Sequence, residues 1–227
     1  YAGFIFGSVK ANALWMSPLM PVIFIMSAVV SGIALCMLTY IVIMEWTAFR
    51  RRKGNDGVSA VEIKGVEHDV INQATKYLLG FLVAAITLEL LDLIFRGYTA
   101  MKSWDILREA MFVNDFTKIF VLQYTLGNLV PLVLLLLPRR TIKRTVLALL
   151  LVLFGVFMMR WNVVIGGQAF SLSFDGFMHY DIPIIPHSLE TFKEGLFGAL
   201  TVIATPFVLF WLINKFVPSL RRDIGEA

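Results

Sequence analysis

Three long apolar runs without a charged residue constrain this sequence more than any other feature. They cover residues 18–44, 119–137 and 195–214. A helix of about 20 largely apolar residues crosses the hydrocarbon core of a bilayer, where backbone amides find no partners outside their own helix. The chain is also 58% hydrophobic and only 16% charged, unlike a soluble domain. We therefore predict an all-α integral membrane protein.

Two further runs are long enough to span but contain charges. Residues 77–95 include Glu89 and Asp92, and residues 145–165 include Arg160 near the end of the run. An arginine at that position can extend its side chain to the lipid headgroups. We expect about five transmembrane helices that form a single bundle over 1–227, with outer loops at 96–118 and 161–194.

Lysine and arginine residues are distributed unevenly between the two predicted sides of the membrane. Segments 45–76, 138–144 and 215–227 hold thirteen of the 20, which places these segments in the cytoplasm. The N-terminus then lies outside the cytoplasmic (inner) membrane and the C-terminus inside. Because the basic residues flank apolar runs, the net charge of +4 does not indicate nucleic-acid binding. An outer start directly before a span, without a signal peptide, is expected of the second half of a longer protein.

Glu89, Asp92 and Arg96 are the leading candidates for chemistry. Their spacing of three and four residues puts them on one helix face, with Glu89 deepest and Arg96 able to pair with Asp92. Carboxyl groups within a span commonly mark a proton or ion path. The alternative is a structural ion pair, with the second acid bonded to a neighbouring helix. Polar residues on the next span are explained as well by bonds between helices as by function; these are Gln123, Tyr124, Thr125 and Asn128.

Histidine and cysteine limit which redox groups the chain can hold. All three histidines, His68, His179 and His187, fall in predicted loops, so no span offers paired imidazoles for a haem. The single Cys36 cannot ligate an iron–sulfur cluster by itself. We predict neither a haem, nor a cluster, nor a metal site in this chain, so that a cluster would belong to a partner.

Three segments together resemble the NrfD/HybB family, the polysulfide-reductase membrane subunits. They are LWMSPLMPVIFIMSAVVSGIA (14–34), ELLDL (89–93) and MRWNVVIGGQ (159–168). The resemblance covers the whole chain and matches the second half of ten-span members. It implies a haem-free helix bundle that docks an extracytoplasmic, ferredoxin-like iron–sulfur subunit, assembles with other membrane and redox subunits, and passes electrons between that iron–sulfur subunit and menaquinone.

The same resemblance implies roles for individual residues. Acidic residues within the bundle serve as proton routes in the family, a role that would fall on Glu89 and Asp92. In relatives the quinone headgroup is bound largely by a first bundle, which we expect this chain to lack, so that the quinone would be bound mainly by that missing half or shared with it. Four residues on the outer side are candidates for contact with the quinone or the partner: Arg160, Asn162, Gln168 and His179.

We expect a membrane subunit of a quinone-linked respiratory oxidoreductase rather than a stand-alone enzyme. Electrons would enter or leave through the partner on the outer side, and protons would move along Glu89 and Asp92. The alternative is half of a transporter or ion channel that uses the same buried carboxyl groups.

Overall fold

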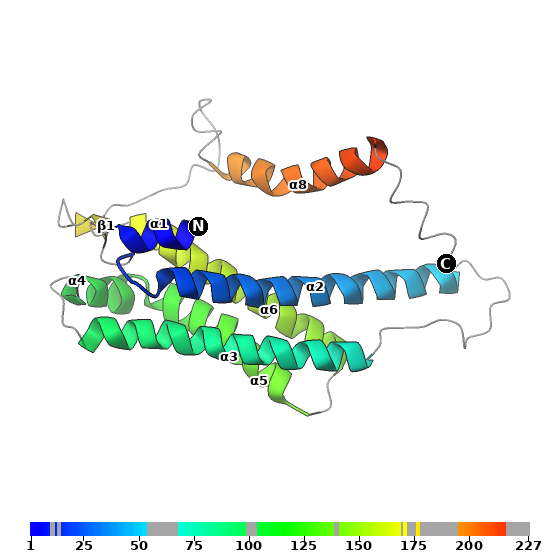
Figure 1. The fold of residues 1–227 in the computed structure, drawn as a ribbon, viewed down its shortest axis with the longest axis horizontal. Helices are drawn as coiled ribbons and strands as arrows, with labels where there is room; N and C mark the ends of the chain where they lie inside the picture. Colours follow the sequence, from blue (N-terminus) through cyan, green and yellow to red (C-terminus); the bar gives the residue numbers. More distant parts are fainter. Residues whose placement is uncertain are drawn as a thin grey trace. The chain divides into compact units, whose positions relative to one another are not determined.

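The computed structural model describes residues 1–9, 12, 15–53, 68–98, 104–138, 141–168, 170–171, 176–177 and 195–216. It contains two compact units, Tyr1–Met178 and His179–Ala227. In the first unit, successive long helices run in alternating directions side by side (Figure 1). They are α2 (Met20–Lys53), α3 (His68–Tyr98), the π-helix η3 (Thr117–Leu129) continued by α5 (Val130–Leu136), and α6 (Ile142–Trp161).

Four helices of the described residues are long and apolar enough to cross a membrane. They cover Met20–Trp46, Asp69–Tyr98, Thr117–Leu136 and Ile142–Gly166. These helices confirm the all-α membrane class and coincide with the predicted spans 18–44, 77–95, 119–137 and 145–165, although the second begins earlier than predicted.

The fifth predicted span, 195–214, coincides with a helix of the second unit. This helix, α8 (Leu196–Phe216), contains Pro206, and its apolar stretch Leu200–Ile213 is shorter than the other four spans. A fifth crossing and a single bundle over the whole chain therefore stay predictions.

A seam of buried apolar side chains holds the first unit together. On α2 and α3 the buried residues recur at alternating spacings of three and four, the pattern by which antiparallel helices interlock side chains. Residues of α5 and α6 complete the same cluster. Its members are Val30, Ala34, Met37, Ile41, Ile71, Leu78, Leu82, Ala85, Leu135, Ala148, Leu149 and Val152.

Two glycines allow η3 and α6 to approach each other closely. A Cβ placed on Gly127 would overlap the Cα of Gly155, and one placed on Gly155 would overlap the Cα, carbonyl carbon and oxygen of Gly127. Small residues at such crossings let membrane helices gain packing energy where lipid supplies no hydrophobic drive. The crossing fixes η3 against α6 just inside the polar end of the bundle.

The segments predicted as outer loops are partly helical. The 96–118 segment contains α4 (Trp104–Glu109) and the π-turn η2 (Ala110–Asn114), and α6 continues into η4 (Asn162–Gly166). After η4 follows a short antiparallel pair, β1 (Phe170–Ser171) and β2 (Gly176–Phe177). The short helix α1 (Ala2–Ser8) precedes the first span.

Candidate functional site

The acidic residues of α3 continue its packing seam. Ile71, Leu78, Leu82 and Ala85 are buried along this face, and Glu89, Asp92 and Arg96 follow at the same alternating spacing. The face that packs the bundle at one end therefore carries carboxyl groups at the other. This arrangement confirms that the three residues share one helix face that points into the protein.

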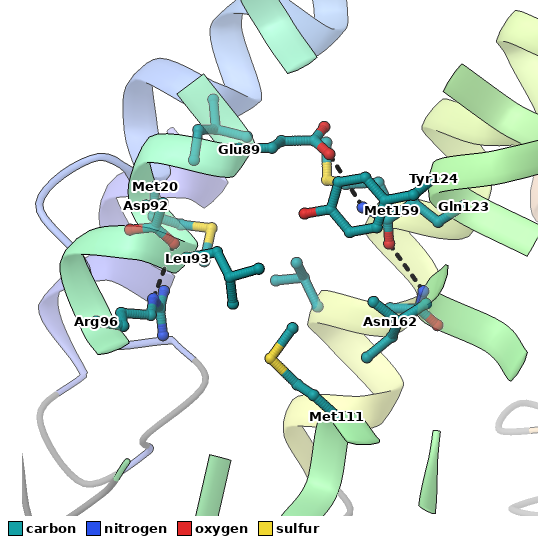
Figure 2. A pocket seen from close by; sticks show the side chains of 13 residues that line it. Met20, Glu89, Asp92, Leu93, Arg96, Met111, Gln123, Tyr124, Met159 and Asn162 are labelled. Carbon is teal, nitrogen blue, oxygen red and sulfur yellow. Dashed lines mark hydrogen bonds and ion pairs between the residues drawn. The ribbon is translucent and has the colours of Figure 1, made fainter. Parts of the chain in front are cut away.

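Glu89 is held by two amides from η3. The Nε2 of Gln123 donates to Oε2 of Glu89 at 3.2 Å, and the Nδ2 of Asn128 reaches the same oxygen at 3.5 Å. Asn162, at the start of η4, donates in turn to Oε1 of Gln123 at 2.9 Å (Figure 2). Because its carbonyl oxygen is occupied by Asn162, Gln123 presents its amino group to the carboxyl group of Glu89.

The π-helical winding of η3 explains why both amides reach Glu89. Gln123 and Asn128 are five residues apart, which places them on different faces of an α-helix. A π-helix bonds each residue to the one five positions on, so residues at that spacing stack on one face. The backbone N–H of Val130 donates to the carbonyl oxygen of Thr125, as this winding requires. Such windings are frequent at functional sites.

Asp92 has partners of a different kind. Arg96 donates from Nε to Oδ2 of Asp92 at 2.8 Å, and the two side chains are 11% and 12% exposed. The hydroxyl of Ser17 donates to the other carboxyl oxygen. A second ion pair joins Asp115 and Lys118. Asp92 thus has a cation beside it, whereas Glu89 is held by neutral amides.

A cavity of about 100 Å³ joins the two carboxyl groups (Figure 2). Figure 2 shows the Tyr124 ring inside it, with the hydroxyl directed toward α3. This volume suits several water molecules. The lining comprises Met20, Ile23, Glu89, Asp92, Leu93, Arg96, Met111, Ile119, Gln123, Tyr124, Met159, Asn162 and Val163.

Of the three predicted outer candidates that the structure describes, only Asn162 joins this cluster. Asn162 is buried beside Gln123. Arg160 is exposed, with its guanidinium 6.0 Å from the ring centre of Phe24, and Gln168 is exposed as well. His179 lies outside the described residues. The sequence analysis gave no role to Ser17, which lies just before α2 and donates to Asp92.

Two of the sequence segments that carry the family resemblance meet beside this cluster. Trp15 donates from Nε1 to the carbonyl oxygen of Val163 at 2.5 Å, and Asn12 donates to the carbonyl oxygen of Gly167. A Cβ on Gly167 would collide with the indole of Trp15, which explains the second glycine of the MRWNVVIGGQ run. The chain before the first span is thereby fixed to the end of α6, with Ser17 over Asp92.

Together, these features define a helical membrane protein with a buried acid–amide cluster at one end of an antiparallel bundle. The family model described as polysulphide reductase, NrfD, matches residues 1–172. The chain belongs to this family, whose members are membrane subunits of quinone-linked oxidoreductase complexes and work with other redox subunits. No curated protein and no solved structure matches the chain.

Proposed function

We propose that this chain exchanges electrons between menaquinone and an extracytoplasmic iron–sulfur subunit, and that Glu89 holds a proton in that exchange. Family membership supports the quinone-linked role. When quinol and quinone interconvert, protons accompany the electrons. An iron–sulfur partner exchanges electrons but not protons, so other side chains must accept and release the protons.

The setting of Glu89 is the observation that carries the proton assignment. A carboxyl group within a membrane bundle is costly and faces the protein interior where it has a task. Here it borders a cavity sized for water, with Asp92 and Arg96 one turn and two turns farther along α3. A cavity that holds water supports transfer of protons. We propose that the quinone binds outside it.

Replacing Glu89 with glutamine tests the proton assignment. Gln keeps the size and can still bond to the amides, but it cannot release a proton. We expect quinol-linked turnover of the purified complex to fall at least tenfold, which corresponds to a barrier higher by about 1.4 kcal/mol. The matched control is Asp69→Asn, an exposed carboxyl at the opposite end of α3. Turnover equal to that of the control would leave Glu89 with a structural role only.

The iron–sulfur partner is tested by isolation of the complex. The chain should co-purify with a ferredoxin-like subunit, and low-temperature electron paramagnetic resonance should show signals from reduced clusters. Addition of quinol should change the size of these signals. A preparation that lacks clusters but transports ions across vesicles would instead indicate a transporter.

We propose further that the complex is sulfite-reductase-linked and that this chain takes the place of its membrane P subunit. The sequence resemblance within the NrfD family supports this placement. Mass spectrometry of the co-purified subunits should then identify the partners of a sulfate-respiring complex. Subunits of a different oxidoreductase would refute this placement but leave the quinone-linked role intact.

A further inference from the structure

The seam on the far side of Glu89 is apolar and buried. Toward the His68 end of α3, the seam contains Ala85, Leu82 and Leu78, which are 6%, 2% and 0% exposed. Ala34 and Leu149, both 0% exposed, close it from α2 and α6. At 1.5 Å per residue, the distance along α3 from Ala85 to Ile71 is about 21 Å.

Buried hydroxyl groups near this seam are occupied by their own helix. Thr75, which is 0% exposed, donates to the carbonyl oxygen of Ile71 at 2.6 Å. The hydroxyl of Ser27 likewise donates to the carbonyl oxygen of Phe24 at 2.9 Å. A proton moves between groups that are about 3 Å apart and hydrogen-bonded, and apolar interiors do not hold the waters that would bridge a longer gap. In the described part of the bundle, the seam therefore interrupts any chain of hydrogen-bonded groups that could carry a proton.

In the opposite direction polar groups follow each other closely. The cavity joins Glu89 to Asp92, and Asp92 contacts Arg96 at 2.8 Å. Both members of this ion pair are slightly exposed, so the polar chain reaches the molecular surface at the end of α3. The distance along the helix from Glu89 to Arg96 is about 10 Å, half of the length of the apolar seam from Ala85 to Ile71.

We propose that Glu89 is the closed inner end of a proton well that opens only at the Arg96 end of the bundle, on the outer side of the membrane. The proposal rests on the proton role of Glu89 given above. Protons that reach Glu89 return to the side from which they came. This bundle thus exchanges protons with the outer side and does not conduct them across the membrane.

Cysteine labelling from either side of the membrane tests the proposal. In a Cys36→Ser background, Leu93→Cys places a thiol in the cavity wall and Leu82→Cys places one in the seam. Sealed right-side-out and inside-out vesicles that contain the assembled complex are treated with silver ions, a membrane-impermeant thiol reagent small enough for a cavity that suits water. Thiols that did not react are then alkylated in denaturant, and mass spectrometry measures the fraction of this subunit that silver protected from alkylation. Ser8→Cys and Gln73→Cys, exposed positions near opposite ends of the bundle, serve as controls for the two sides.

We expect Leu93→Cys to react from the outer side only and Leu82→Cys to react from neither side. Reaction of either thiol from the inner side, or no reaction of Leu93→Cys, would overturn the proposal. Labelling does not depend on turnover, so it separates the two hypotheses. If Glu89→Gln leaves turnover unchanged while labelling is one-sided, the proton role is wrong and the one-sided opening remains.

Discussion

Replacement of Gly155 by leucine is expected to prevent the subunit from accumulating in the membrane. The new side chain would point at the backbone of Gly127, where the Cα, the carbonyl carbon and the oxygen leave no room even for a Cβ. Overpacking against movable side chains costs about 1–3 kcal/mol. Backbone atoms cannot swing aside, so η3 and α6 must separate and the cost should exceed that range.

Gly32 provides the matched control for this substitution. It lies within α2, and a Cβ there would meet nothing within 4 Å. Gly32→Leu should therefore accumulate like the natural protein and resist unfolding by detergent to the same extent. Equal detergent resistance of Gly155→Leu and Gly32→Leu would show that η3 and α6 do not cross at these glycines.

Loss of Arg96 is expected to destabilise the bundle strongly. Arg96→Leu leaves the carboxylate of Asp92 largely buried, with Ser17 donating to it but without its cation. Removal of one partner from a buried pair costs about 3–5 kcal/mol, mainly because the other charge stays behind. The double variant Asp92→Leu/Arg96→Leu removes both charges and should recover most of this loss. Free energies of unfolding in mixed detergent measure both variants.

Lys118→Leu is the control for the ion-pair experiment. It breaks the pair with Asp115, in which the lysine side chain is 57% exposed, so the expected cost is below about 1 kcal/mol. If Arg96→Leu costs no more than Lys118→Leu, the ion pair of Asp92 is not buried in the assembled protein. If the double variant is no more stable than Arg96→Leu, the unpaired carboxylate of Asp92 is not the cause of the lower free energy of unfolding.

The sequence predicted the helices and the common face of the acids because both depend on local spacing. Charge-free runs define membrane spans, and residues at spacings of three and four share a side of any α-helix. The residue pattern alone therefore places Glu89, Asp92 and Arg96 together, and it puts Asn162 at the correct end of the bundle. The proposed roles of these residues in proton movement stay predictions.

The partners of Glu89 could not be predicted in the same way. An α-helix would direct Gln123 and Asn128 to different neighbours, and no residue pattern indicated that η3 is wound as a π-helix. Likewise, the contacts of Ser17 with Asp92 and of Trp15 with Val163 join segments far apart in the sequence. Such contacts depend on how the helices assemble. The spacing of residues along one segment carries no information about that assembly.

The apolar seam on α3 also orients the carboxyl group of Glu89, which lies toward the other end of the same helix. A helix transmits rotation along its axis, so the interlocked side chains from Ile71 to Ala85 set the direction in which Glu89 points. Ile71 lies about 27 Å from Glu89 along that axis. A substitution at Ile71 that rotates α3 about its axis would therefore change the direction of the Glu89 carboxyl group. It would do so without changing any residue that lines the cavity.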